Sequence, residues 1–378
     1  MLEQKKISLM DHIKSIPDPR IDRQKRHNLE DILAIAICAI ICGADDWVSI
    51  QEFGKAKREW FKTFLQLPNG IPSHDTFGRV FSLIAPSHFQ QCFINWVESV
   101  TDILKGQVVA IDGKTLRRSH DKKSEKSAIH MVSAWAAKNR TVLGQVKTEE
   151  KSNEITAIPE LLEVLDISGC IVTIDAMGCQ KKIAGKIIEK DADYILALKG
   201  NQGNLAKEVE AFFTEADKNS YNGMSVDFYE TKDVNHGRIE YRRYWLTDDI
   251  DGIAGAESWP GLKTVGMVES ERHVDDDVSI EYRYYISSIE NDAKKFGDGV
   301  RAHWGIENSL HWVLDIAFRE DESRVRTGNA PENLATARHI ALNLLKNEKT
   351  AKIGVKNKRL KAGWDNSYLA KLLIGNCF

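Results

Sequence analysis

The feature that most constrains the fold is a change of hydrophobic period near Gln107. Before this residue, apolar side chains recur every three or four positions, as they do in amphipathic helices. The segments with this period are residues 28–44, 47–65 and 87–105. The sequence therefore predicts an all-helical N-terminal domain over residues 1–105.

After Gln107, short apolar runs of strand composition alternate with helical segments, which predicts an α/β domain around a mixed sheet. The expected strands cover residues 107–113, 130–137, 141–148, 170–178 and 193–200. Alternating segments at about 220–290 predict a mostly antiparallel, β-rich insertion, and helices then continue to about residue 345. We expect the α/β domain to span residues 106–345 and a basic C-terminal tail to span 346–378, as a clamp on DNA or a disordered end.

Composition excludes several classes of protein. The formal net charge is -3, so any binding to nucleic acid depends on local patches. Six cysteines without a C-x-x-C pair argue against a disulfide framework and a structural zinc site. The longest apolar run, residues 33–44, is too short to span a membrane, and no signal peptide is apparent. We therefore expect a cytoplasmic protein without membrane contact.

The stretch "VVAIDGKTLRRS" at residues 108–119 contains Gly113-Lys114-Thr115, which resembles the end of a phosphate-binding loop. A P-loop needs a second glycine five residues before the first, because its backbone N–H groups wrap the phosphates. That position is Val108, inside the expected strand. No nucleotide cofactor is therefore expected, and Asp112 becomes the residue of interest.

Asp112 in "AIDG" has a counterpart in Asp175 of "TIDA", since each follows an apolar run. Ligands of open α/β sheets bind at the carboxyl ends of strands, so the two carboxylates could share a site. Glu307 could add a third, on a helical face that also carries His303 and His311. The alternatives are ordinary turn or cap roles for the aspartates, a solvated helix face, and a zinc site at His303, Glu307 and His311.

Several stretches resemble the DDE transposases of bacterial insertion sequences. "HWGIEN" at 303–308 is similar to the R-W-x-I-E core of their Y-x2-R-x3-E-x6-K signature. "DYILALKGNQ" at 193–202 and "NHGRIEYRRY" at 235–244 are similar to stretches that follow the second Asp in that family. Together with the helical N-terminal segment, the resemblance covers the whole chain and points to the H-repeat-associated branch. It makes residues 1–105 a DNA-binding or associated domain.

The resemblance implies an RNase H-like fold and a DDE triad of Asp112, Asp175 and Glu307. It implies a transposase that cleaves DNA strands at the ends of its element and transfers them into target DNA. Two Mg²⁺ ions, or Mn²⁺, suit such carboxylates because hard cations prefer oxygen ligands. The resemblance makes Asp112 the bridging ligand, with Asp175 and Glu307 each completing one metal shell.

DNA would be held by basic and polar side chains near these carboxylates, through phosphate contacts that weaken with salt. The candidates are Lys114, Arg117, Arg118, Lys199, Asn201, His236, Arg238, Arg243 and His303. Arg242 and Arg243 follow each other in one strand, so they should point to opposite faces. The expected partner is double-stranded DNA, comprising terminal inverted repeats and target, bound by a homodimer.

Three signature positions differ from the family pattern. Val300, His303 and Leu314 stand where the signature has Tyr, Arg and Lys. Leu314 cannot contact phosphate, so the role of that lysine is absent or filled by another residue. Two alternative functions remain: an inactive DNA-binding relic of a mobile element, and an RNase H-like nuclease without strand transfer.

Overall fold

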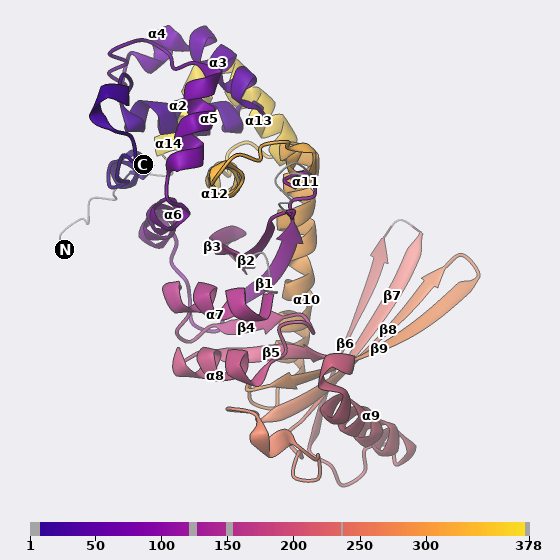
Figure 1. Cartoon of the computed structure of the whole chain (residues 1–378). Coiled ribbons are helices and arrows are strands. Elements are labelled where there is room, and N and C mark those ends of the chain that lie inside the picture. Colours follow the sequence, from indigo (N-terminus) through magenta and orange to yellow (C-terminus); the bar gives the residue numbers. More distant parts are fainter. Residues whose placement is uncertain (1–7, 121–126, 149–153, 236, 375–378) are drawn as a thin grey trace, which may run out of the picture.

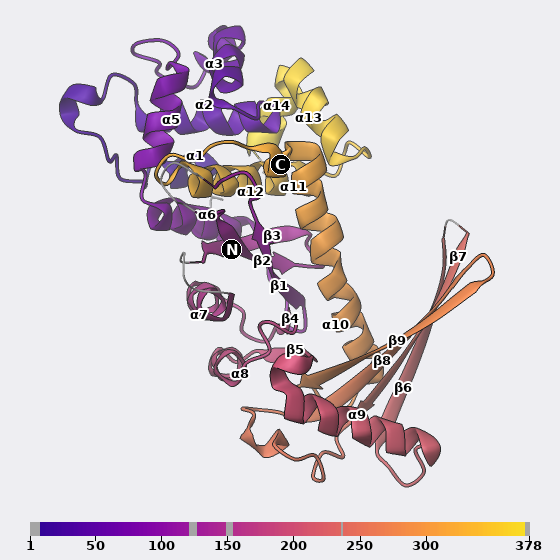
Figure 2. The same cartoon turned by 45° about the vertical axis from the view of Figure 1, so that its right-hand side comes forward.

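The computed structural model describes residues 8–120, 127–148, 154–235 and 237–374. It has a helical layer at one end, a central mixed sheet with helices on both faces, and a projecting β insertion (Figures 1 and 2). The expected α/β class with a mixed sheet is confirmed. His236 and the basic residues Lys122, Lys123 and Lys126 lie outside the described residues.

The helical layer is built by segments from both ends of the chain. Its N-terminal helices are α1 (Leu9–Ile13), α2 (Leu29–Ile41), α3 (Trp47–Ala56), α4 (Arg58–Phe61), α5 (His74–Leu83) and α6 (Pro86–Val100). Its C-terminal helices are α12 (Ala330–Asn347), α13 (Val355–Trp364) and α14 (Asn366–Ile374). Helix α2 is apolar on all sides and packs against α3, α12 and α13, as expected for a fully buried helix. No helix in the described ranges is both long and apolar enough to cross a bilayer.

The basic tail expected at 346–378 is largely folded. Helices α13 and α14 cover α2 and α12, and two of their cations are buried. Lys358 donates to the carbonyl of Leu345 at 2.9 Å, and Arg359 donates to that of Ile40 at 2.8 Å. These charges belong to the core because backbone carbonyls and carboxylates surround them. The helices of residues 1–105 therefore share one core with the C-terminal end of the chain.

The central sheet has nine strands in the order β3-β2-β1-β4-β5-β9-β8-β7-β6. The strands that end before residue 200 are β1 (Val108–Thr115), β2 (His130–Ala136), β3 (Thr141–Lys147), β4 (Ile171–Ile174) and β5 (Asp193–Leu198). The later strands are β6 (Val226–Asn235), β7 (Arg238–Thr247), β8 (Thr264–Val274) and β9 (Asp277–Ser287). Strand β1 is antiparallel to β2 and parallel to β4, which is parallel to β5.

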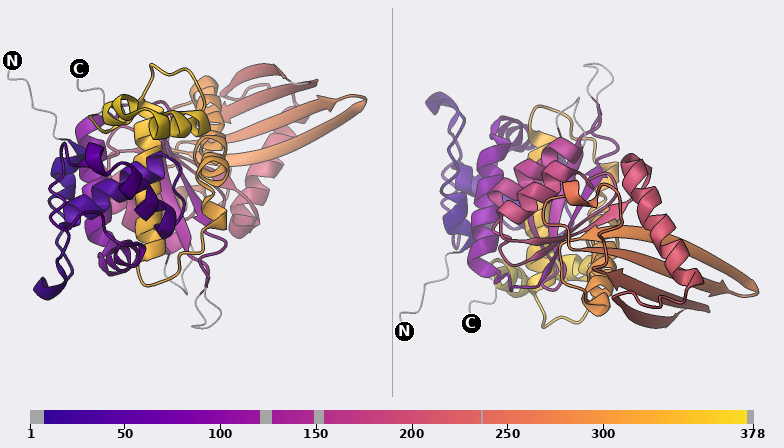
Figure 3. Two further views of the ribbon diagram at one scale, coloured as in Figure 1. Left: turned by 90° about the horizontal axis from the view of Figure 1, so that it is seen from above. Right: turned by 90° about the horizontal axis from the view of Figure 1, so that it is seen from below.

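The β insertion extends this sheet. Strand β9 pairs with β5 in antiparallel fashion, so the four insertion strands continue from the edge of the α/β core. Their far ends project away from the body of the molecule (Figures 1 and 3). Helix α9 (Gly203–Lys218) packs against β9.

Helices on opposite faces of the core hold the sheet between them. Helices α7 (Glu154–Val164) and α8 (Lys181–Glu189) cover one face. Helix α10 (Ala293–Ile306) crosses β1, β4 and β5 on the other (Figure 2). A π-helical turn (Glu307–His311) joins it to α11 (Trp312–Phe318). This single long helical run brings Glu307 over Asp112, which lies within β1, and over Asp175, which directly follows β4.

Candidate active site at the carboxyl ends of β1 and β4

The strand register brings the two aspartates to one edge of the sheet. Ile111 of β1 is paired with Ile174 of the parallel strand β4, so Asp112 and Asp175 come next at the same level. Asp112 accepts a hydrogen bond from the amide of Gly113 at 2.9 Å. Asp175 accepts from the amides of Met177 and Gly178 at 3.1 and 3.3 Å. The side-by-side arrangement expected from the two similar motifs is therefore present.

Glu307 begins the π-helical turn and lines a cavity of about 190 Å³ together with Asp175. π-Helical turns are rare and frequently mark functional sites. The helical face that carries His303, Glu307 and His311 at i,i+4 spacing does lie against the sheet. His303 lies 3.1 Å from the hydroxyl of Thr173 on β4, and His311 lies 3.4 Å from Asp112 on β1.

The acidic side chains act on one another. Burial, followed by the charges of Asp175, Glu154 and Glu307, raises the pKa of Asp112 to about 7 against the hydrogen bond from Gly113. Three carboxylates are thus close enough to oppose the ionisation of Asp112. Such repulsion is relieved when a cation binds among the groups.

Among the residues that the structure describes, no three His, Cys, Asp or Glu side chains stand close enough together to hold one metal ion. This includes the zinc alternative at His303, Glu307 and His311, whose histidines contact different strands. The oxygen-rich donor set at Asp112, Asp175 and Glu307 still matches hard divalent cations. Its unrelieved repulsion is the observation that favours a cation here.

His311 and Glu154 are neighbours of Asp112 that the sequence did not predict. Burial, with the nearby charge of Lys114, lowers the pKa of His311 to about 4, so this imidazole is neutral beside Asp112. Glu154 receives a contact of 2.7 Å from His130. A Cβ at Gly113 would overlap both, which explains the glycine after Asp112. In the sequence, only Gly113 indicated that another side chain comes close to β1 here. No sequence pattern identified Glu154 as that side chain.

Lys114 does not lie where we expected it. Its ammonium group contacts Asp315 and lies 2.8 Å from Glu320, and only 11% of its side chain is exposed. Lys114 shares a face of β1 with Asp112, and α11 and the following turn cover that face. The lysine is therefore held inside the protein by two carboxylates instead of facing a phosphate.

The other candidates near the acidic edge are exposed. Arg117 lies 3.1 Å from Asp321 with 80% of its side chain exposed, and Arg118 is also exposed. Lys199 is exposed and lines the cavity of Asp175 and Glu307. Asn201 donates to the carbonyl of Ala176, so its amide supports the turn after Asp175.

Two further candidates for DNA binding, His303 and Arg243, lie in different environments. Burial lowers the pKa of His303, which leaves a neutral ring hydrogen-bonded to Thr173. Arg243 contacts Glu230, Glu269 and Glu271, so its charge is matched by three carboxylates.

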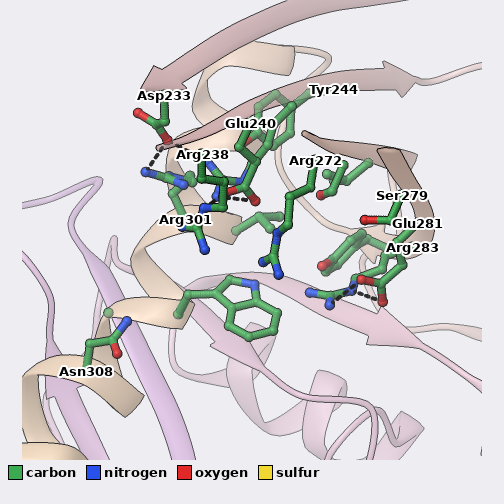
Figure 4. A pocket seen from close by; sticks show the side chains of 17 residues that line it. Asp233, Arg238, Glu240, Tyr244, Arg272, Ser279, Glu281, Arg283, Arg301 and Asn308 are labelled. Carbon is green, nitrogen blue, oxygen red and sulfur yellow. Dashed lines mark hydrogen bonds and ion pairs between the residues drawn. The ribbon is translucent and has the colours of Figure 1, made fainter. Parts of the chain in front are cut away.

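A pocket of about 600 Å³ lies between the insertion strands and α10 (Figure 4). Arg238 and Arg242 line it, whereas Arg243 does not, as strand alternation predicted. Its other arginines, which the sequence did not single out, are Arg272, Arg283 and Arg301. Arg283 stacks over Trp304 with 4.4 Å between guanidinium and ring centre. Arg283 and Trp304 also line the cavity of Asp175 and Glu307, so the two hollows adjoin.

Comparisons with known proteins agree along the whole chain. Residues 10–97 match the family model described as DDE_Tnp_1-associated, and residues 103–344 match the Transposase DDE domain. The chain is 48% identical to "Putative transposase YncI" of Escherichia coli O157:H7, covering 97% of this chain and 94% of that protein. It is 44% identical to "H repeat-associated putative transposase YhhI" of Escherichia coli K12, covering 97% and 98%. A piggyBac transposase synaptic complex with hairpin DNA aligns at 12% identity with a TM-score of 0.44, over 98% of this chain and 80% of that chain.

Proposed function

Because the chain belongs to the DDE transposase family, in its H-repeat-associated branch, we propose that it cleaves DNA at element ends and joins the cut strands to target DNA. Asp112, Asp175 and Glu307 form the catalytic triad of this proposal. The observation that carries it is the parallel register that aligns Asp112 with Asp175, under the helical turn that begins with Glu307.

The strand order also supports this proposal. Strands β3-β2-β1-β4-β5, with β1, β4 and β5 parallel and β2 antiparallel, are consistent with the RNase H-like core that the family resemblance implies. The insertion lies between β5 and the helix that leads to Glu307. This arrangement leaves the carboxyl ends of β1 and β4 for DNA.

In this proposal Asp112, Asp175 and Glu307 would hold Mg²⁺, or Mn²⁺, through their oxygens, once the side chains move closer together than they stand in the described structure. When bound, such ions activate the attacking oxygen and stabilise the leaving one. The chain's own groups do the positioning: His311 lies against Asp112, and the His303–Thr173 contact ties α10 to β4. Lys199, exposed at the edge of the same cavity, is a cation for the phosphate.

DNA is the proposed partner, and Lys199, Arg117 and Arg118 are its proposed contacts near the acids. Arg238, which is exposed in the insertion pocket with Glu240 at 3.4 Å, extends them, whereas Lys114 and Arg243 are held by two and three carboxylates. A homodimer on DNA and a cytoplasmic location stay predictions.

The test is a reaction of purified protein with DNA carrying the element's terminal repeats, a target plasmid and Mg²⁺. Joined product supports transposition, nicks alone support a nuclease, and binding without cutting supports an inactive relic. Asp112→Asn should abolish cleavage and leave DNA binding largely intact, because it removes a proposed metal ligand and no phosphate contact. Asp249→Asn, at an exposed aspartate of the insertion, is the matched control and should cleave normally. Cleavage by Asp112→Asn would overturn the assignment.

A further inference from the structure

Another cleft, of about 740 Å³, lies between helix α5 and the loop of residues 323–329, which follows the short helix Glu320–Glu322. Arg79 of α5 lines one wall, and Arg324 and Arg326 of the loop line the other. The cleft is therefore built jointly by the N-terminal helical layer and the α/β domain. Three arginines therefore line it.

These arginines have no carboxylate partner. In the ranges that the structure covers, no ion pair involves Arg79, Arg324 or Arg326, and both Arg79 and Arg324 are exposed. Of the aspartates that line the cleft, Asp45 lies 3.3 Å from Arg359, whereas Asp46 accepts a hydrogen bond from the amide of Ser49 at 2.8 Å and keeps its negative charge. The third, Asp75, lies 3.5 Å from His74.

Most arginines of the insertion pocket differ in this respect, and Arg272, for which the described structure has no ion pair, is the exception. Arg242 lies 2.6 Å from Asp233, Arg283 lies 2.8 Å from Glu281, and Arg301 also contacts Asp233. A guanidinium already paired with a carboxylate gains less from a phosphate, because the existing pair must first be broken. The three arginines of the cleft at α5 therefore lack direct ion pairs in the described structure, although the carboxylates of Asp46 and Asp75 stand on the same walls.

The two walls of the cleft are fixed to each other. Asn333, which is fully buried, donates to the carbonyls of Phe81 and Ile84 at 2.8 and 2.9 Å. Asn329 donates to Ile84 as well, at 3.1 Å. Gly328 has a positive φ of 52°, and a Cβ there would meet a backbone oxygen of α5. The loop is thus held against α5 before any ligand binds, which reduces the entropy lost on binding.

The cleft connects to the acidic site through the loop after β1. The side chain of Arg326 donates to the carbonyl of Arg118 at 3.0 Å. Arg118 is exposed and follows Asp112 by six residues in the chain. A line of arginines therefore leads from the carboxyl end of β1 to the helical layer.

We propose that this cleft binds the phosphate backbone of double-stranded DNA and guides it to the acidic site. The inference rests on the proposed function and adds a DNA contact to the N-terminal helical layer. Arginine side chains recognise phosphate in bidentate fashion, and such contacts carry affinity independent of base sequence.

The test compares Arg79→Gln/Arg324→Gln with wild type in binding a labelled random-sequence duplex, by fluorescence anisotropy over a series of salt concentrations in EDTA. Each lost phosphate contact lowers the slope of log affinity against log salt by about one. The double variant should therefore bind more weakly, with a slope lower by about two. The matched control is Lys55→Gln/Lys62→Gln, which removes two exposed cations of the same layer that are paired with Glu52 and Glu59. Its slope should equal that of wild type.

The outcomes separate the two claims. Wild type that binds no duplex would overturn both the proposed function and this inference. Wild type that binds, with an unchanged slope in the double variant, would overturn the inference alone. Circular dichroism checks folding, and if the double variant does not fold, the single variants should each lower the slope by about one.

Discussion

Asp112 is the side chain whose ionisation the fold opposes most clearly. Its pKa of about 7 lies well above the value of about 3.9 in an unfolded chain. Between these two values the native state holds a proton that the unfolded state has released. This favourable contribution to the free energy of unfolding is complete below about pH 4 and is lost as the pH rises through 7.

Asp112→Asn should therefore stabilise the metal-free protein at pH 8, by on the order of 2–4 kcal/mol, because it removes a charge that burial and then the neighbouring carboxylates disfavour. The gain should vanish toward pH 4, where Asp112 is neutral in both states. Urea unfolding in EDTA across this pH range measures it, with Asp249→Asn as the control. Adding Mg²⁺ should then stabilise wild type at pH 8 more than Asp112→Asn. A variant less stable than wild type at pH 8 would contradict the electrostatic account.

Lys114→Met tests the corrected position of the lysine. The change keeps the aliphatic stem but leaves the buried Glu320 without its nearest cation. Against the effect of burial, Lys114 and Arg338 lower the pKa of Glu320 to about 2, and loss of the lysine should raise it. We expect a loss of about 3–5 kcal/mol in the free energy of unfolding. Arg117→Gln, at an exposed site, should leave stability nearly unchanged.

If Lys114→Met instead weakened only DNA binding, the lysine would face a phosphate after all.

At this scale the sequence predicts the three carboxylates, but it does not indicate the environment of their neighbours. Asp112 and Asp175 could be proposed because each stands in a short local motif, "AIDG" or "TIDA", after an apolar run. Lys114 was misjudged because its partner Asp315 is 201 residues away. Local charge patterns do not reveal which distant element covers a strand.

At the scale of elements, the buried side-chain amide of Asn343 joins helix α12 to strand β3. Asn343 is fully buried, donates to the carbonyl of Val142 at 2.9 Å, and accepts from the amide of the same residue. Val142 belongs to β3, the strand at one edge of the sheet. The asparagine thus supplies the hydrogen bonds that a further strand would make.

Asn343→Leu should lower the free energy of unfolding by about 2–4 kcal/mol, because it leaves the buried N–H and C=O of Val142 unpaired at similar side-chain volume. Chemical denaturation measures the loss. The same substitution at the exposed Asn222 is the control and should have little effect. Equal stability of both variants would mean that Val142 finds another partner or water.

Element limits were largely predictable from hydrophobic period. Strand β7 occupies residues 238–247 as alternation predicted, and Glu307 lies on the expected helical face. The π-helical turn was not predictable, since no proline or glycine occurs within Glu307–His311. Nor was the pairing of β5 with β9, because pairing between distant strands depends on the whole sheet.

The molecule as a whole is organised around a helical core that both ends of the chain complete. The sequence suggested a separate helical domain and a basic tail, since Lys and Arg dominate the stretch from 346 to 361. It could not reveal that Arg359 reaches the carbonyl of Ile40, 319 residues earlier. Composition describes charge, but only the packed structure shows which charges have internal partners.

A chain ending at Lys349 should therefore be destabilised rather than merely weakened in DNA binding. It lacks the Arg359 contact to Ile40, the bond of 2.9 Å from Tyr368 to Glu348, and the buried Leu369. Apolar surface of α2 and α12 becomes exposed, so urea unfolding should begin at clearly lower concentration and lose cooperativity.

The full-length variant Lys352→Gln/Lys356→Gln provides the comparison, because it removes two exposed cations of the same segment without changing its packing. Its unfolding should match wild type. If the shortened chain also unfolded like wild type while binding DNA less tightly, residues 350–378 would act as a basic tail. The shared core predicts the opposite, since α2 is apolar on all sides and α13 covers part of it.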